Sequence, residues 1–397
     1  MPDIKVFLNN NSGYRLLAIS STKSEKLIEG NDLVALDYFI RDNQRSYIFG
    51  FLTYDLKNEI ESLVSNNPDR IEFPGFYFFV PDILVKVEQN NSFSYLTGVN
   101  SFENNKVIRD FLESSKSRQV NNIKLNESID KLTYINKVDC LKQHIQKGDI
   151  YEVTFCQEFF NENANINPVS TYFKLNSKTN APFSCYLQFG DKHLISGSPE
   201  RFIKKTGDKL ISQPIKGTAR RSADPEEDIE IKKGLFEDEK ERSENVMIVD
   251  LVRNDLSKIA EKNSVTVEEL FGVYTFNTVH QLISTVSANL KKNISFSEII
   301  KALFPMGSMT GAPKIKAMEL IEEYETFKRG LFSGSVGYIK PDGDFDFNVI
   351  IRSILYDDKT KQLSCPVGGA ITIRSDSEKE YEECLLKVQA LKDVLNE

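Results

Sequence analysis

The sequence contains no tryptophan and only three histidines and five cysteines among its 397 residues. The cysteines, which include no CxxC pair, are Cys140, Cys156, Cys185, Cys365 and Cys384. Their odd number and their scatter argue against a disulfide framework and against the usual zinc sites. We therefore expect reduced, semi-buried thiols.

Long apolar runs and clustered positive charge are also absent. No stretch of about 20 apolar residues occurs that could span a membrane, and the start MPDIKVFLNNNS lacks the apolar run of a signal peptide. The net charge of −8 disfavours nucleic acid and anionic membranes as partners. Neither GxGxxG nor GxxxxGK[ST] is present, which disfavours nucleotide binding. We expect a cytoplasmic protein that binds a small molecule or another protein.

The remaining composition is that of a globular protein, with 40% hydrophobic and 27% charged residues. Up to about Gly98 short apolar runs alternate with polar breaks, which indicates strands with one or two helices. Residues 100–132 are rich in Asn, Ser, Lys and Glu, which indicates a surface connection around the short helix FLESSKSR. The pattern predicts an N-terminal region 1–130 with little motif content and a second region 131–397.

In the second region, strand signals gather in 184–216 and 331–373, and helical spacing appears in 224–257, 293–304, 312–326 and 376–396. The strands come in hairpins, which favours antiparallel sheets over a strict βαβ alternation. The sequence predicts an α+β fold.

One hairpin brings an acid and an amine together. The turn is predicted at residues 206–209, between SPERFIKK and KLISQPIKG. In that register Glu200 faces Ile215 and Pro199 faces Lys216, so Glu200 and Lys216 become near neighbours. An ordinary ion pair on a solvated hairpin is the alternative to a functional pair.

Four further charged side chains fall on apolar faces. Glu244 shares one side of its helix with apolar residues at i+3, i+4 and i+7, so its carboxylate points to the core unless it reaches water. Glu383 and Lys387 are an i, i+4 pair within an apolar stripe, where a surface salt bridge is the alternative. Arg352 shares a face of the predicted strand NVIIRSILY with Ile350 and must meet an anion, either a structural acid or a substrate carboxylate.

Two glycine-rich segments, MGSMTGAPK and PVGGAIT, can expose backbone N–H groups to a carboxylate. Taken with the buried acids and the arginine, they indicate a metal-assisted site for a small polyanion. Two carboxylates can hold Mg²⁺, which completes its shell with waters and substrate oxygens.

Several ordered motifs resemble one known family. They are SPERF, PIKGT, ENVMIVDLVRNDL, VHQLISTV, GSMTGAPK, FNVIIRS and EKEYEECLLKV. In this order they resemble the chorismate-utilising enzymes, which include anthranilate, aminodeoxychorismate, isochorismate and salicylate synthases. The resemblance runs from about residue 133 to the end. It implies an α+β fold of the anthranilate synthase component I type, a large mixed antiparallel-sheet body with sheets packed face to face and helices outside.

The resemblance also implies residue roles. Glu244 and Glu383 match Mg²⁺-binding acids, with Glu241 as a further acid at the metal end. Arg352, with Tyr338 nearby, matches a contact to the enolpyruvyl side. The other matching positions line the substrate pocket and are Gly217, Thr218, Thr310, Gly368 and Lys387.

Lys216 distinguishes the branches of this family. Enzymes that resemble aminodeoxychorismate synthase have PIKGT where anthranilate synthases typically have PIAGT, so the lysine favours the folate branch. Isochorismate and salicylate synthases carry a water-activating lysine where this chain has Glu152, which disfavours water addition. In the implied mechanism the neutral amine of Lys216 attacks C2 of chorismate, and Glu200 helps the C4 hydroxyl to leave. Burial and Mg²⁺ are expected to keep the amine neutral.

Departures from the family pattern occur at Glu152, Thr154, Gln281 and Ala370. We expect none of them to touch Lys216, Glu200 or the metal positions.

The chain has no GxCxG-like glutaminase nucleophile, so a separate glutamine amidotransferase subunit is expected to supply ammonia. It ends just after the helix of Glu383, which predicts no fused lyase. One alternative is an anthranilate synthase large subunit. Another is a non-catalytic, amino-acid-binding relative, since this fold can carry a tryptophan site around a segment resembling Pro182-Phe183-Ser184.

Overall fold

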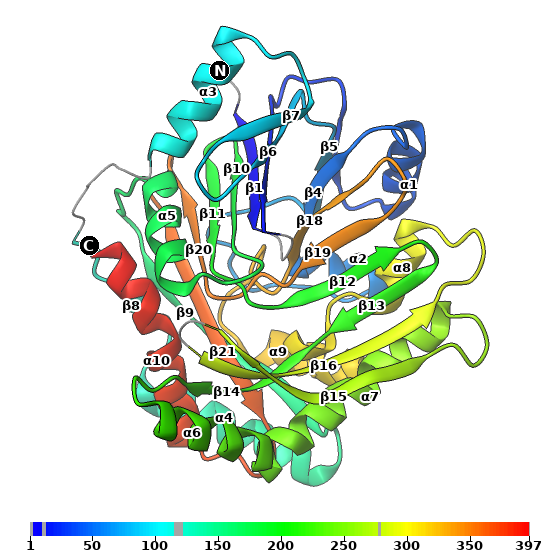
Figure 1. The fold of residues 1–397 in the computed structure, drawn as a ribbon. Coiled ribbons are helices and arrows are strands. Elements are labelled where there is room, and N and C mark those ends of the chain that lie inside the picture. Colours follow the sequence, from blue (N-terminus) through cyan, green and yellow to red (C-terminus); the bar gives the residue numbers. More distant parts are fainter. Residues whose placement is uncertain (1–2, 10–12, 115–121, 277–278, 397) are drawn as a thin grey trace.

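The computed structural model describes residues 3–9, 13–114, 122–276 and 279–396. Two large sheets pack face to face, with helices around them (Figure 1). All strand pairings found in the described part of the chain are antiparallel. The expected α+β architecture is confirmed.

The first sheet includes the strands that carry Glu152 and Gly368. Its order is β17 (Gly311–Ala312), β9 (Glu152–Asn161), β21 (Leu363–Ile371), β20 (Ser353–Asp357), β11 (Lys192–Ser196), β10 (Cys185–Phe189), β1 (Ile4–Asn9), β2 (Arg15–Ser20), β6 (Ile83–Val87) and β7 (Phe93–Thr97), with β8 (Asn126–Glu127) beside β9.

The second sheet carries Lys216 at one end. Its order is β14 (Ile215–Arg220), β16 (Val279–Asn289), β13 (Lys209–Gln213), β12 (Arg201–Thr206), β19 (Phe345–Asn348), β18 (Ser335–Ile339), β4 (Ile48–Leu52), β5 (Phe76–Phe79) and β3 (Leu27–Gly30), with β15 (Thr266–Thr275) beside β16.

The helices surround the sheets. They are α1 (Leu33–Asp42), η1 (Tyr54–Leu56), α2 (Lys57–Glu61), α3 (Phe102–Glu113), α4 (Lys131–Lys147), α5 (Pro168–Thr179), α6 (Pro225–Glu237), α7 (Glu239–Ile259), α8 (Phe296–Leu303), η3 (Gly307–Met309), α9 (Lys314–Tyr324) and α10 (Ser377–Leu395).

The core forms two apolar clusters. One contains side chains of both sheets together with α1, α7 and α8, and in it Phe189 of β10 packs against Tyr77 of β5 with ring centroids 4.6 Å apart. The other joins the first sheet to α3, α4, α5, α9 and α10. The first sheet therefore has apolar groups on both faces, as a central layer requires.

The predicted helix over 224–257 is two helices rather than one. Asp238 leaves the helical conformation between α6 and α7, and its side chain accepts a hydrogen bond from the backbone N–H of Glu241. An aspartate that caps the next helix in this way begins a new helix instead of continuing the old one. The other three predicted helices are confirmed as α8, α9 and α10.

The strands before residue 130 are part of both sheets. In the first sheet β1 pairs with β10, and in the second β4 pairs with β18. Of the predicted helix FLESSKSR, the residues Phe111–Glu113 end α3, and 115–118 lie outside the described residues. The boundary near residue 130 stays a prediction.

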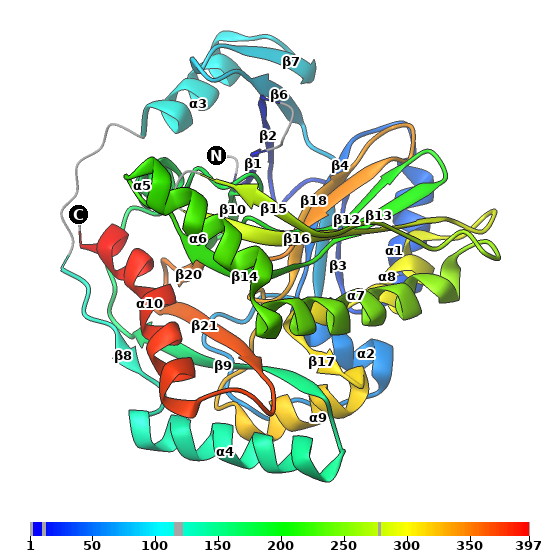
Figure 2. The ribbon, with the colours of Figure 1, turned by 60° about the horizontal axis from the view of Figure 1, so that its bottom comes forward.

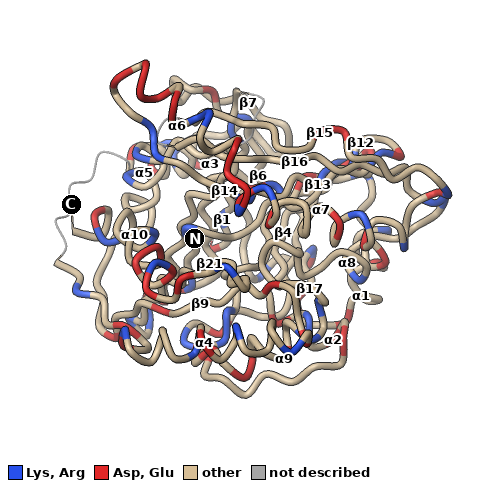
Figure 3. The backbone as a smooth tube through the Cα atoms, turned by 90° about the horizontal axis from the view of Figure 1, so that it is seen from below, with Lys and Arg blue, Asp and Glu red and all other residues tan. Residues whose placement is uncertain are grey.

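No helix in the described ranges is both long enough and apolar enough to cross a membrane. Figure 3 shows basic and acidic residues interspersed on the elements it displays, with both signs on α6 and α10. All five cysteines are free, and four of them are buried. The prediction of reduced thiols agrees with this arrangement.

Candidate active site

Lys216 lies at an irregularity of β14. The ladder to β16 pairs Ile215 with Ile283, and the register then shifts before Thr218. Such a bulge turns side chains away from the regular alternation of a strand. The side chain of Lys216 is consequently 10% exposed instead of lying on a solvated hairpin.

Lys216 forms a buried ion pair with Glu152 of β9. Its Nζ donates to Glu152 Oε1 over 2.6 Å, and the side chain of Glu152 is fully buried. The second oxygen, Oε2, has no hydrogen-bond partner in the described part of the chain. The expectation that Glu152 does not touch Lys216 is therefore wrong. Glu152 is on β9 of the first sheet and Lys216 on β14 of the second, and the two strands meet at this point.

The ion pair determines the proton state of Lys216. Burial by itself lowers the pKa of Lys216, but the charges of Glu152, Glu244 and Glu200 outweigh burial and raise it. The ion pair therefore favours the ammonium. Burial alone does not give the uncharged amine that the resemblance asks for, since burial also brought carboxylates to Lys216, and the expected contribution of Mg²⁺ stays a prediction.

The hairpin that carries Glu200 has the predicted turn, in which Thr206 pairs with Lys209. The predicted register holds at Lys204 and shifts by one residue at Arg201, because a bulge intervenes. The predicted facing of Glu200 with Ile215 is therefore out by one residue, although both remain at the same end of the hairpin.

Glu200 is buried and hydrogen-bonded. Its side chain receives a hydrogen bond from Ser308 Oγ to Oε1 over 2.7 Å. Burial raises the pKa of Glu200 to about 7, although Ser308, Lys216 and Arg352 each act to lower it. Near neutral pH this carboxyl can therefore either give or take a proton.

The segment after Phe304 holds β9 beside Glu200. The backbone N–H of Thr154 donates to Thr310 O over 2.7 Å, and Thr310 is fully buried. A Cβ on Gly311 would lie 2.1 Å from Glu152 O, and Gly311 has a φ of +152°. Only glycine allows this approach, so the segment can bring Ser308 and β9 together.

Acidic residues of α7 and α10 lie near Lys216, since Glu244 acts on the pKa of Lys216 and Lys216 acts on the pKa of Glu383. Figure 2 shows α7 and α10 on either side of β14 and β21. Burial raises the pKa of Glu244 to about 7 and also raises the pKa of Glu241. Lys240 Nζ lies 3.4 Å from Glu380 Oε1 and 3.8 Å from Glu244 Oε1. The predicted inward orientation of Glu244 is confirmed, since the residue is 6% exposed.

Glu383 and Lys387 form the predicted pair, with 2.7 Å between Oε1 and Nζ. Burial would raise the pKa of Glu383, but Lys387 outweighs it and the pKa is lowered. Lys387 also donates to Gly368 O over 2.7 Å. A Cβ on Gly368 would lie 2.3 Å from Phe155 O, so β21 approaches β9 closely here. The pair thus joins α10 to the sheet at the site.

The acidic residues fit a hard cation, although no group of three or more potential metal ligands is gathered in the described ranges. Glu244 Oε1 is buried and lacks a hydrogen-bond partner. A buried carboxylate without a partner is a group that a divalent cation satisfies. Mg²⁺ commonly uses one or two carboxylates and completes its shell with waters and substrate oxygens. Glu241, Glu244 and Glu383 remain predicted ligands on this basis.

Arg352 lies in a connection between the sheets, not in a strand. β19 ends at Asn348 in the second sheet, and β20 begins at Ser353 in the first. The predicted continuous strand is therefore wrong at this point. Arg352 has a φ of +51°, which is uncommon outside glycine and clusters at functional sites. Its guanidinium has no hydrogen-bond or ion-pair partner in the described part of the chain, and Glu200 is the charge that acts on it.

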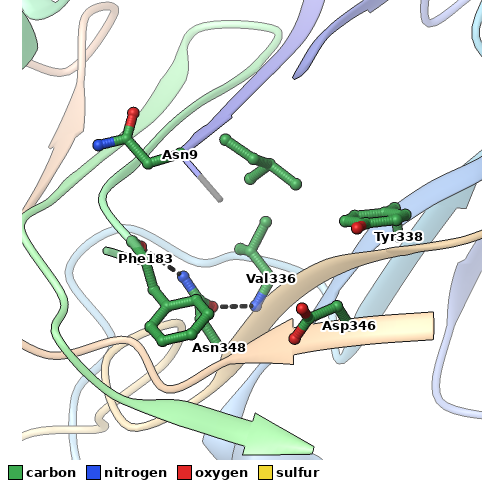
Figure 4. Close-up of a pocket in the computed structure, with 7 residues that line it drawn as sticks. Asn9, Phe183, Val336, Tyr338, Asp346 and Asn348 are labelled. Atoms are coloured by element: carbon green, nitrogen blue, oxygen red, sulfur yellow. Dashed lines mark hydrogen bonds between the residues drawn. The ribbon is translucent and has the colours of Figure 1, made fainter. Parts of the chain in front are cut away.

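Tyr338 lies in another pocket. It stacks on Phe49 and lines a small hollow together with Phe183, Asp346 and Asn348. Asn348 donates to Phe183 O and accepts from the backbone of the neighbouring strand (Figure 4). The expected place of Tyr338 beside Arg352 is not supported, and the role of Tyr338 as an enolpyruvyl contact stays a prediction.

Thr218 is exposed, and its Oγ1 accepts a hydrogen bond from Gln281 Nε2 over 3.3 Å. Gly217 lies beside the acidic residues, since a Cβ there would be 3.1 Å from Glu241 Oε2. Sequence reasoning missed Ser308 and Lys240. Both flank positions that it did select, but a serine in a loop and a lysine on a charged helix carry no signal of their own.

The fold and these contacts define an enzyme-like site in which a buried amine, several buried carboxylates and an unpaired guanidinium converge. The comparison with known proteins identifies the class. A family described as "chorismate binding enzyme" matches residues 13–393, and the chain belongs to this family. The match begins far before residue 133, where the sequence resemblance was expected to start.

Curated relatives carry two kinds of name. "Aminodeoxychorismate synthase component 1" of Escherichia coli (strain K12) is 34% identical over 86% of this chain and 75% of its own length. "Anthranilate synthase component 1" of Aquifex aeolicus is 31% identical over 87% of this chain and 73% of its own length. "Aminodeoxychorismate synthase, chloroplastic" of Arabidopsis thaliana is 33% identical, and the chain spans less than half of that protein, 45%.

A solved structure shares the fold. Anthranilate synthase component I from Streptococcus pneumoniae matches with a TM-score of 0.77 and 25% identity, over 99% of this chain and 90% of that chain. The expected architecture of the anthranilate synthase component I type is thereby confirmed.

Proposed function

We propose that this protein is the large subunit of an aminodeoxychorismate synthase, which converts chorismate and ammonia to 4-amino-4-deoxychorismate for folate and 4-aminobenzoate synthesis. The observation that carries the proposal is the buried amine of Lys216 near the buried carboxyl of Glu200, whose pKa it acts to lower. Relatives named aminodeoxychorismate synthase support it.

The proposed reaction replaces the C4 hydroxyl of chorismate by an amino group. The neutral amine of Lys216 attacks C2 of chorismate, both conjugated ring double bonds shift, and the C4–O bond breaks as Glu200 gives its proton to the leaving hydroxyl. Ammonia then adds at C4, both double bonds shift back, and the C2–N bond to Lys216 breaks. Glu200 takes a proton from the new ammonium, so chorismate and ammonia give the product and water.

The remaining groups bind the substrate. The unpaired guanidinium of Arg352 suits the enolpyruvyl carboxylate, since it stays charged at any physiological pH. Glu244 and Glu383, with Glu241 nearby, would hold Mg²⁺, which would supply positive charge to the ring carboxylate. Lys387 pairs with Glu383 and donates to Gly368 O, and we assign Gly217, Thr218 and Thr310 to the substrate pocket because the resemblance implies it.

The nitrogen source that we propose is a glutamine amidotransferase partner. The proposal is based on the relative named "Aminodeoxychorismate synthase component 1", since that name implies a second component. The sequence contains no GxCxG pattern around any of its cysteines, so this chain does not supply a nucleophile of that kind.

Anthranilate synthase component I is the second candidate. A relative of that name and the pneumococcal structure favour it. Its reaction eliminates pyruvate, whereas aminodeoxychorismate formation retains the enolpyruvyl group. The amine of Lys216 favours the first candidate over this one. It also speaks against a non-catalytic, amino-acid-binding relative.

The product decides between the two enzymes. The protein is incubated with chorismate, Mg²⁺ and an ammonium salt, and the products are separated and identified by mass and fluorescence. We expect 4-amino-4-deoxychorismate, with the rate lowered on the order of 10³-fold or more by Lys216→Ala. Lys209→Ala is the matched control, because Lys209 forms a half-exposed ion pair with Glu268. Fluorescent anthranilate without added lyase would identify the second candidate instead.

A further inference from the structure

Resting on the function proposed above, we propose that Glu152 is the base that takes the proton from Lys216 before the amine attacks the substrate, and that it returns this proton when the lysine is expelled. The need for such a base follows from the charges of the site. In the ion pair with Glu152 the resting amine carries its proton, and an ammonium has no lone pair with which to attack.

Distance and burial select Glu152 for this role. Its Oε1 is 2.6 Å from Lys216 Nζ, within the range over which a positioned base takes a proton directly. The side chain is fully buried, and that of Lys216 is 10% exposed. Water is therefore a poor competitor for this proton.

The other carboxylates are less suited. Glu200 accepts a hydrogen bond from Ser308 and has to give its own proton to the leaving hydroxyl. Glu244 and Glu241 belong to the acidic residues assigned to the cation, and neither forms an ion pair with Lys216 in the described ranges. Glu152 is thus the carboxylate that contacts the amine.

Cancellation of charge makes the transfer less costly, although the ion pair is the resting form. One oxygen of Glu152, Oε2, is buried without a hydrogen-bond partner in the described part of the chain. Moving the proton from Lys216 to Glu152 replaces two buried charges by two neutral groups, and a neutral group is far less costly to bury than an incompletely paired ion. The neutral pair is therefore within reach during turnover.

The backbone holds Glu152 in place. On β9 the ladder pairs it with Ala312, and the N–H of Tyr151 donates to Ala312 O over 2.7 Å. Gly311 approaches so closely that no side chain fits there. A base fixed by a strand on one side and by a glycine on the other keeps its distance to the amine through the cycle.

The proton balance closes over the cycle. Glu152 changes from carboxylate to carboxylic acid as Lys216 changes from ammonium to amine. The amine then forms the C2–N bond and becomes a secondary ammonium. When ammonia has added at C4 and the C2–N bond breaks, Lys216 leaves as a neutral amine and receives the proton back from Glu152. The ion pair is restored, and no other reactant is needed.

Glu152→Gln tests this role, because the amide keeps the shape and accepts a hydrogen bond but takes no proton. We expect kcat with ammonium to fall by about 10²-fold or more, while KM for chorismate changes by no more than about threefold. Glu158→Gln is the matched control. Glu158 is a buried glutamate of the same strand, but it pairs with Arg70 instead of Lys216, so its kcat should stay near that of the wild type.

A second readout separates a base from a mere charge partner. Labelling of Lys216 by an amine-reactive reagent, followed by peptide mass spectrometry, reports its neutral form without substrate. In Glu152→Gln the amine loses its anionic partner, so labelling at neutral pH should be as fast as in the wild type or faster. Lower kcat with undiminished labelling supports the base. Unchanged or higher kcat overturns it, and so does a parallel loss of kcat and labelling, which would mean that Glu152 only positions the amine.

Two further comparisons keep the outcome decisive. If Glu152→Gln lacks the far-UV circular dichroism of the wild type, Glu152→Asp replaces it. The retained carboxylate predicts a kcat within about tenfold of the wild type, and a larger loss overturns the proposal. The wild-type product is identified separately. Anthranilate there would contradict the proposed function, whereas the labelling of Lys216 would still test Glu152.

Discussion

Glu200 is buried beside two cations, Lys216 and Arg352, and beside the hydroxyl of Ser308. Burial raises its pKa to about 7 despite these three groups. A general acid must be protonated to act, and the protonated fraction falls as the pH rises through the pKa. We predict that kcat/KM for chorismate falls above about pH 7, measured as a pH profile with ammonia concentration held constant.

Ser308 offers an internal test of this assignment. Its hydrogen bond stabilises the ionised form of Glu200 and so lowers the pKa. Removing it in Ser308→Ala should move the falling limb of the profile to higher pH. A limb that stays in place, or moves down, would show that another group is being titrated.

Glu244 should govern the response to Mg²⁺. Its Oε1 is buried without a hydrogen-bond partner in the described part of the chain, and Lys240 Nζ lies 3.8 Å from it, so Glu244→Gln removes a negative charge that would attract Mg²⁺. Loss of groups that support a metal ligand typically weakens binding 10–100-fold, and loss of a direct ligand should weaken it at least tenfold. Calorimetric titration with Mg²⁺ measures this without turnover. Asp250→Asn on the same helix, 73% exposed, is the control, and equal affinities in the two variants would remove Glu244 from the metal site.

For single residues, the sequence predicted which side chains point inward or pair along a helix better than it predicted contacts between distant segments. The inward orientation of Glu244 and the pair of Glu383 with Lys387 follow from helical spacing alone, and both are confirmed. The contact of Glu152 with Lys216 could not be predicted, because 64 residues separate them and they belong to different sheets. A periodic pattern carries no information about such a pair.

Among the connecting elements, the loop between α9 and β18 does most to hold the site together. Arg329 is fully buried there and donates to Thr154 O over 2.8 Å and to Met309 O over 2.6 Å. Its partner Glu325 accepts from the backbone N–H of Cys156 over 2.8 Å. One buried ion pair thus joins β9, η3 and the loop in front of β18.

Breaking this pair should therefore destabilise the protein severely. Arg329→Leu leaves Glu325 buried without its cation and frees two carbonyl groups, which predicts a loss of about 3–5 kcal/mol in the free energy of unfolding. Urea unfolding measures it. Arg253→Leu, which breaks an exposed pair with Asp250, should cost about 1 kcal/mol or less. Similar losses in both variants would contradict the role given to Arg329.

Element boundaries show where local reasoning from the sequence stops. Asp238 three residues before Glu241 is a capping signal that ends one helix and starts another, and it was readable from the sequence. The end of strand β19 before Arg352 could not be read from the sequence. Residues 349–351 are apolar because the chain passes from one sheet to the other through the core, and this run is indistinguishable from a buried strand.

Over the whole molecule, the N-terminal strands complete both sheets. β1 and β2 lie in the middle of the first sheet, next to β10, and β4 lies beside β18 in the second. The core around Phe49, Phe51 and Phe78 packs with α8 and with β19. The family match from residue 13 agrees with this arrangement. The family motifs in the sequence begin after residue 130, but the region 131–397 shares its core with the strands before residue 130.

A chain restricted to residues 131–397 should therefore fail to fold. It would leave the edges of β10 and β18 unpaired and expose apolar surface that the N-terminal strands cover, a state prone to edge-to-edge aggregation. We expect no cooperative thermal transition by circular dichroism and elution as aggregate. Adding residues 1–130 as a separate chain should restore part of the fold only if the two fragments pair during refolding. A monomeric 131–397 fragment with a sharp transition would instead show that the boundary near residue 130 separates two independently folding units.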